Sequence, residues 1–195
     1  MNLYQNTMMT AVIPDMTADG SIRNIEITPL TSMAQARAQS MQGGMTQANI
    51  VLANASMGQF FDIGDILITQ PMDPLVQDSG QGANQDQRIY GMTLAAMSQE
   101  AYELAMPYSS GIVTAMMDDA SDGIMDTKMS GNHISMGGMG GMMGGIMMQS
   151  TAGTSDPASA MTTFIDNTTY NRSGLTTTDL QTLIDKLNAS NGTIQ

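Results

Sequence analysis

The sequence predicts a mainly α-helical protein, with five or six short amphipathic helices in a bundle or array, preceded by a short β segment. Three observations support this prediction. Apolar residues recur at three- and four-residue spacing through most of the chain. Ser, Thr and Pro stand where these segments begin, and Gly or Asn-Gly where several of them end. The chain also lacks a nucleotide-binding loop and the alternating pattern of a βαβ protein.

Residues 1–27 are expected to form the β segment. The apolar run MMTAVIP is closed by Pro14, a polar turn follows, and IRNIEI mixes apolar and polar residues. Because an isolated hairpin is marginal in water, we expect this segment to be the end of a β domain or an addition to one. Residues 28–195 then form the helical module, with a Met/Gly-rich loop at 129–150.

The first two expected helices begin at threonine caps. Thr28 precedes Pro29, which the first helical turn tolerates, and the sequence QGG ends this helix. Its apolar face consists of Leu30, Met33, Ala34, Arg37 and Met41. The second helix begins at Thr46, and its face is expected to contain Ile50, Val51, Ala53 or Asn54, and Met57.

The clearest helix pattern covers residues 84–106, after a connector at 62–74 that ends in two prolines. Its apolar stripe comprises Ile89, Met92, Ala96, Met97, Ala101 and Leu104. Glu100 and Glu103 lie three residues apart on this helix, and we interpret them as a solvated surface pair. Another helix is expected from Ser109 or Ser110 to near Gly123.

Two further helices are expected in the last forty or so residues. One begins at Ser155 or Asp156, with Pro157 in its first turn, and the other has a threonine cap and Asp179 in its first turn. Their expected apolar residues are Ala160, Met161, Phe164 and Ile165 in the first, and Leu180, Leu183, Ile184 and Leu187 in the second.

The charge balance argues against two classes of partner. Acidic residues outnumber basic ones by 18 to 6, and the net charge is −12. Binding to nucleic acid or to an anionic membrane surface needs clustered Lys and Arg, whereas the basic residues here are scattered. No stretch approaches the roughly 20 apolar residues that span a bilayer. We therefore expect no nucleic-acid partner and no membrane span.

The chain contains no cysteine, which excludes disulfides, thiolate metal sites and thiol catalysis. Its low charge content and its many Thr, Ser, Asn and Gln residues are typical of an extracellular protein. Neither a G-x-S-x-G motif nor another catalytic constellation accompanies the single histidine. We therefore expect no enzymatic activity.

Several ordered motifs resemble a known kind of module. These are ITPLTSMAQARA (27–38), MTQANIVLANASMGQFFDIGDILITQPMDP (45–74), YGMTLAAMSQEA (90–101) and TTFIDNTTYNRSGLTTTDL (162–180). Together they resemble the helical module that follows immunoglobulin-like or transthyretin-like β domains in large secreted bacterial cell-surface proteins, over about residues 25–195. The resemblance implies a non-catalytic extracellular role. It does not account for the methionines, because this family usually has Ala, Leu or Val at those positions.

The Met/Gly-rich stretch HISMGGMGGMMGGIMM (133–148) is the first candidate site. Thioethers are soft ligands suited to Cu(I) and Ag(I), and paired glycines let a backbone fold around an ion. The candidate ligands are His133, Met136, Met139, Met142, Met143, Met147 and Met148. The alternative is that flexible methionines fill gaps against neighbouring helices or subunits. An uncharged loop of this kind also suits a contact surface.

The acidic stretch DDASDGIMDTKM is the second candidate site, for Ca²⁺. Its acidic residues and its Gly123 turn match part of a calcium loop, but Ala120 and Met129 stand where that loop needs ligands. The candidate ligands are Asp118, Asp119, Asp122 and Asp126. The alternative interpretation is a solvated acidic helix end.

These observations predict a structural protein: a subunit or module of a bacterial surface or filamentous assembly. Its partners would be further copies of itself or other cell-surface proteins, joined by β-strand addition through residues 3–27. The alternative function is a Cu(I)- or Ag(I)-binding surface protein that uses the Met-rich loop.

Overall fold

The computed structural model describes residues 8–15, 24–106, 109–136, 146–147 and 155–195. Within these ranges the protein is mainly α-helical, as the sequence predicts. The helices are α1 (Pro29–Ser40), α2 (Gln47–Phe60), α3 (Ser79–Gly82), α4 (Gln85–Glu103), α5 (Ser110–Ser121), α6 (Ser155–Asp166) and α7 (Thr177–Ala189).

Polar residues set the starts of these helices, and the sequence predicted the threonines that cap α1 and α2. Thr28 caps α1 by accepting a hydrogen bond from the backbone N–H of Thr31, and Thr46 caps α2 by accepting one from Asn49. Asn84 and Gln87 bond reciprocally at the start of α4. The single turn of α3 was not predicted, since SGQG has no apolar periodicity to indicate a helix.

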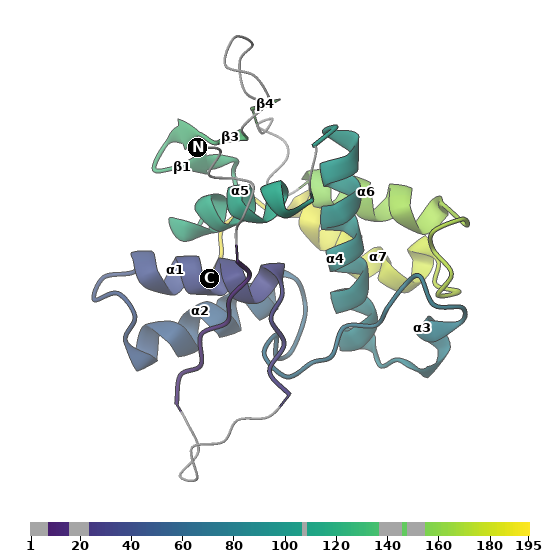
Figure 1. The fold of residues 1–195 in the computed structure, drawn as a ribbon, viewed down its shortest axis with the longest axis horizontal. Helices are drawn as coiled ribbons and strands as arrows, with labels where there is room; N and C mark the ends of the chain where they lie inside the picture. The colour runs from purple at the N-terminus through teal and green to yellow at the C-terminus, as the bar shows by residue number, and fades with distance from the viewer. Residues whose placement is uncertain (1–7, 16–23, 107–108, 137–145, 148–154) are drawn as a thin grey trace.

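Helix α4 stands between two groups of helices (Figure 1). Helices α1, α2 and α5 pack together on one side, and α6 and α7 pack together on the other. Helix α4 contacts α6 extensively and α5 at fewer positions. One large core cluster includes residues from every helix except α3.

Methionine fills much of this core. The buried methionines are Met33, Met57, Met72, Met92, Met97, Met116, Met125 and Met161. Each packs where a leucine would serve in many proteins, and the flexible thioether suits the irregular gaps between helices that meet at different angles. Helical spacing predicted five of these as core residues, and the structure confirms all five: Met33, Met57, Met92, Met97 and Met161.

The predicted face of α2 is wrong at one residue. Ile50, Ala53 and Met57 are buried, but Val51 is exposed together with Leu52. Consecutive positions lie about 100° apart around a helix, so Ile50 and Val51 cannot both point into the same narrow contact.

The β structure lies elsewhere than at the start of the chain. Strands β1 (Lys128–Met129) and β2 (Asn132–His133) pair antiparallel, as do β3 (Ser135–Met136) and β4 (Ile146–Met147). The described residues before Thr28 form no strand. Side chains of α1 and α2 satisfy their backbone instead: Ser32 accepts from the N–H of Thr10, and Asn54 donates to the carbonyl of Val12. The rest of the predicted 1–27 segment lies outside the described residues.

The end of the chain is held against the turn after α5. The N–H of Met125 donates to the carbonyl of Gly192, and the N–H of Ile194 donates to that of Gly123. Ile194 is buried as a result. This places the acidic turn at 122–126 beside residues 192–194.

Candidate functional site

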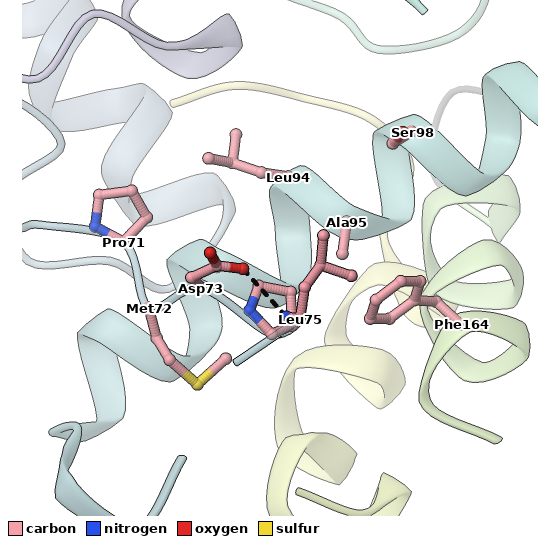
Figure 2. A pocket seen from close by; sticks show the side chains of 10 residues that line it. Pro71, Met72, Asp73, Leu75, Leu94, Ala95, Ser98 and Phe164 are labelled. Atoms are coloured by element: carbon pink, nitrogen blue, oxygen red, sulfur yellow. Dashed lines mark hydrogen bonds between the residues drawn. The ribbon is translucent and has the colours of Figure 1, made fainter. Parts of the chain in front are cut away.

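An apolar groove lies between the connector at 71–75, α4 and α6 (Figure 2). Its volume is about 350 Å³. Leu94, Ala95 and Ser98 face it from α4, and Phe164 faces it from α6. A second hollow of about 290 Å³ shares several of these residues and extends the groove to Tyr102 and Tyr170.

The connector wall of the groove presses directly against α4. The N–H of Met72 donates to the carbonyl of Gln87 at 3.0 Å. A Cβ atom on Gly91 would lie only 2.0 Å from the carbonyl oxygen of Met72. Glycine is therefore required at position 91 for this wall to hold its position.

The loop that follows α6 is hydrogen-bonded to the far side of the connector. The N–H of Arg172 donates to the carbonyl of Pro74, and the N–H of Asp78 donates to that of Arg172, both at 2.8 Å. Asn171 fixes this loop in turn, because its Nδ2 donates to the carbonyls of Ile165 and Leu175. The walls of the groove are thus joined by backbone hydrogen bonds between segments about a hundred residues apart.

The chemistry of the groove is that of a binding surface. Asp73 is the one charged residue in its described lining, and its Oδ1 accepts a hydrogen bond from the N–H of Leu75 at 2.9 Å. That lining, as far as the structure describes it, contains no histidine or lysine that could act as a general base beside Ser98. Leu75, Tyr102 and Tyr170 are exposed at its edge.

The acidic residues predicted as calcium ligands lie on α5 and in the turn that follows. Oδ1 of Asp119 accepts hydrogen bonds from the backbone N–H groups of Asp126 and Lys128, both at 3.1 Å. Asp122 accepts from Ile124 and from Ser130. These carboxylates therefore organise the turn that leads into β1.

Asp122 and Asp126 lie in the turn after α5, and Asp119, on α5, accepts hydrogen bonds from that turn. Asp118 lies on α5, where burial raises the pKa of its carboxyl group. Within the part of the chain that the structure describes, no three His, Asp or Glu side chains are grouped so that they could hold a metal ion. Calcium binding stays a prediction.

The soft-metal candidates are only partly described. His133 is exposed on β2, opposite Lys128 on β1. The pairing of β3 with β4 places Met136 opposite Ile146 and Met147 opposite Ser135. Met139, Met142, Met143 and Met148 lie outside the described residues.

Glu100 is an unexpected feature of α4. The prediction of a solvated pair holds for Glu103, which is exposed, but is wrong for Glu100, which is only 3% exposed. The spacing of the sequence indicates that Glu100 is buried, because it lies four residues after Ala96 and three after Met97, on the apolar stripe of α4. Neither of its carboxylate oxygens has a hydrogen-bond partner among the described residues.

Comparisons of the chain with models of protein families, with curated proteins and with solved structures find no match. None of the helices in the described ranges has the length and apolar character needed to cross a bilayer. The evidence for function therefore comes from the geometry of the groove and from the other exposed apolar surfaces.

Proposed function

We propose that this protein is a non-catalytic extracellular structural protein whose copies join head to tail in a surface or filamentous assembly. The observation that carries the proposal is the presence of two separate apolar surfaces. One is the groove beside α4 and α6. The other is formed by Val51 and Leu52 on α2 and by Ile13 and Pro14 in the N-terminal segment, and it is called here the α2 patch.

The α2 patch is an exposed and uncharged surface. Val51 is 51% exposed and Leu52 is 50% exposed. The N-terminal segment is held beside them, because Asn54 donates to the carbonyl of Val12 at 3.0 Å. Pro14 and Val51 border a hollow of about 220 Å³. Apolar side chains grouped in this way mark contact surfaces more often than solitary exposed ones do.

Both surfaces carry little charge. Asp73 is the one charged residue in the described lining of the groove, and Asp65 is the one in the lining of the hollow beside the α2 patch. Both surfaces therefore suit an uncharged apolar ligand better than an anionic one. A second copy of this chain, in which 24 of 195 residues are charged, supplies an exposed and uncharged apolar surface of this kind.

The positions of the surfaces favour an open assembly. Helix α2 lies toward one end of the long axis of the molecule, and α6 lies toward the other (Figure 1). An interface between two different surfaces is heterologous, so repeated contacts produce a ring or a filament rather than a closed dimer. The extracellular setting is supported by the composition and by the resemblance of residues 25–195 to helical modules of secreted bacterial surface proteins.

The first test is the solution mass of the protein by light scattering over a range of concentrations. The wild type should form species larger than 20.6 kDa that grow with concentration. Leu52→Asp in the α2 patch and Leu75→Asp in the groove should each leave a monomer. Met129→Asp serves as the matched control, because Met129 is similarly exposed but lies on β1.

Mixing the two variants distinguishes a head-to-tail contact from a symmetric one. Each variant retains the surface that the other has lost, so a head-to-tail contact predicts that the mixture forms a 1:1 pair. A symmetric contact predicts no such pair, and a wild type that stays monomeric at high concentration would refute the proposal.

The alternative is a Cu(I)- or Ag(I)-binding protein. One observation favours it: β3 and β4 bring the backbones of Met136 and Met147, at the two ends of the Met/Gly-rich stretch, onto neighbouring strands. Its test is an anaerobic Cu(I) titration against a competing chelator, with a variant that has Leu at all six methionines of 136–148. Tight uptake that the variant loses would establish this function, and equal weak uptake by both would exclude it.

A further inference from the structure

Aromatic side chains gather at the outer end of the groove. The chain has only three phenylalanines, five tyrosines and no tryptophan. Three of these residues, Tyr102, Phe164 and Tyr170, line the hollow of about 290 Å³ that extends the groove. Phe164 is buried, whereas Tyr102 is 79% exposed and Tyr170 is 57% exposed. Two exposed rings beside one hollow, in a chain with so few aromatic residues, indicate a binding surface.

Both tyrosines stand on an ordered backbone. Tyr102 follows Ser98 by four residues, so both lie on the face of α4 that borders the groove. Tyr170 lies in the turn after α6, where its N–H donates to the carbonyl of Asn167 at 3.0 Å, and the N–H of Asn171 donates to the same carbonyl at 2.8 Å. Because the backbone that carries the two rings is ordered before a ligand arrives, the entropic cost of binding is reduced.

The polar groups of this hollow are neutral. None of the residues in its described lining is charged, and the lining includes the hydroxyl of Ser98 and the amides of Gln99 and Asn167. Nε2 of Gln99 donates to Glu103 at 2.9 Å, so its amide oxygen is the atom that can accept from a ligand. Oδ1 of Asn167 accepts from the N–H of Thr169 at 3.2 Å, so its Nδ2 is the group that can donate. The hollow thus offers donors and acceptors to an uncharged ligand.

We propose that this end of the groove binds a neutral β-linked oligosaccharide. A sugar ring with equatorial hydroxyls presents C–H groups on both of its faces, and the electron-rich faces of Tyr102 and Tyr170 attract such groups. The hydroxyls lie around the edge of the sugar, where Ser98, Gln99 and Asn167 supply neutral hydrogen-bond partners. An anionic polysaccharide is disfavoured, because the described lining offers no cation and the chain carries a net charge of −12.

Sugar binding goes beyond the proposed assembly and gives one end of it a role. An open head-to-tail assembly leaves the groove of one terminal subunit unoccupied by a neighbour. That groove would attach the assembly to a neutral polysaccharide at the cell surface. This role rests on the proposed function, but the binding of a sugar to a single copy does not, so the two are tested separately.

The test is isothermal titration calorimetry with cellohexaose, a chain of β-linked glucose, and with chitohexaose, a chain of β-linked N-acetylglucosamine. The protein carries Leu52→Asp, so that the α2 patch of another copy cannot occupy the groove. At least one of the two sugars should bind saturably at millimolar concentration or below, and the comparison shows which is preferred. Saturable binding of neither sugar would overturn the proposal. If a sugar binds but light scattering shows that the wild type never assembles, the assembly is wrong and the sugar site stands.

Variants in the same background locate the binding site. Tyr102→Ala and Tyr170→Ala should each weaken binding at least about 5-fold, as when an aromatic stacking surface is removed from beneath a nucleic-acid base. Tyr102→Phe and Tyr170→Phe keep the rings and should keep most of the affinity. Ile68→Ala is the matched control, because Ile68 is 62% exposed but lies outside the described lining of the hollow. Since these positions are exposed, the variants should fold. Unchanged affinity in both alanine variants would refute the site.

Two further probes test the class of ligand. Choline is a small cation that binds to the faces of aromatic rings, and hexagalacturonate is an anionic sugar chain of the same length as the two neutral ones. Neither should bind, either by calorimetry or by a change in tyrosine fluorescence, which can be observed directly because the chain has no tryptophan. Binding of choline in place of the sugars would identify an aromatic cation site, and preferential binding of hexagalacturonate would contradict the charge argument. Either result would overturn the proposal.

Discussion

At the residue scale, Tyr90 joins three segments of the chain through one hydroxyl group. Tyr90 is fully buried on α4, and its Oη lies 2.5 Å from Oγ1 of Thr28, the cap of α1. The same hydroxyl donates to the carbonyl of Ile66 in the connector at 3.0 Å. Burial raises the pKa of Tyr90 to about 12, so the hydroxyl keeps its proton throughout the physiological range.

Replacing Tyr90 by Phe should lower the free energy of unfolding by about 1–3 kcal/mol, because the carbonyl of Ile66 is left without this partner in the core. Urea denaturation measures the change. Tyr102→Phe is the control, since Tyr102 is exposed, and it should stay within about 0.5 kcal/mol of the wild type. Equal changes in the two variants would show that the buried hydroxyl has no special role.

The contact at Gly91 gives a second prediction at this scale. Gly91→Ala should destabilise the protein by about 1–3 kcal/mol, because the new methyl group overlaps the backbone of Met72. Gly82→Ala is the matched control: it also lies in a helix, but an added Cβ meets nothing within 4 Å among the described residues. Thermal unfolding of both variants should therefore show a loss only at position 91.

At the element scale, the first turn of α7 depends on one side chain. Oδ2 of Asp179 accepts hydrogen bonds from the backbone N–H and from the hydroxyl of Thr176, both at 2.8 Å. These bonds lower the pKa of Asp179, the backbone bond having the larger effect. The carboxylate also carries a negative charge at the N-terminal end of the helix, where the dipole favours it.

Asp179→Ala should therefore fray the first turn of α7, at a cost of about 1 kcal/mol at neutral pH. The lowered pKa sets the sign of the pH dependence. The stabilisation is present above the pKa of the unfolded chain and is lost as the pH falls through the folded value, so variant and wild type should converge in strong acid. Hydrogen exchange at residues 177–180 reports the fraying directly, and an unchanged rate would contradict the prediction.

Elements were predictable where their signals are local. Thr28 and Thr46 lie within a few residues of the helix starts that they cap. The apolar stripe of α4 repeats every three or four residues along the helix that it identifies. The conformation of residues 8–13 was not predictable in this way. Its backbone partners, Ser32 and Asn54, lie more than twenty residues away, and the apolar run around Val12 suits a strand equally well.

At the scale of the whole molecule, eight methionines of the described residues serve as packing material in the core. Met57 is fully buried in the main core cluster. Met57→Leu keeps the volume and should cost less than about 1.5 kcal/mol, whereas Met57→Ala leaves a cavity and should cost about 2–5 kcal/mol. Denaturant unfolding of both variants gives the comparison. A large loss with Leu would mean that the thioether itself is needed.

The groove could not be predicted from the sequence, because its walls come from three distant segments. The sequence indicated Pro71 and Pro74 as parts of a connector, and Phe164 as part of a helix. Nothing local shows that Arg172 bonds to Pro74, or that Gly91 allows the connector to approach α4. Glu100 is a different case, since its place on the apolar stripe was visible and only its charge suggested a solvated position.

The backbone pairing between Pro74 and Arg172 also sets an order of events during protein synthesis. The ribosome delivers the connector and α4 first, and Phe164 and the loop at 171–175 only much later. A nascent chain that stops before Phe164 has one wall of the groove and no opposite wall. The surface proposed to hold the next copy is thus completed only after residues 164–175 have been made, so nascent chains that are shorter than this cannot yet join one another through the groove.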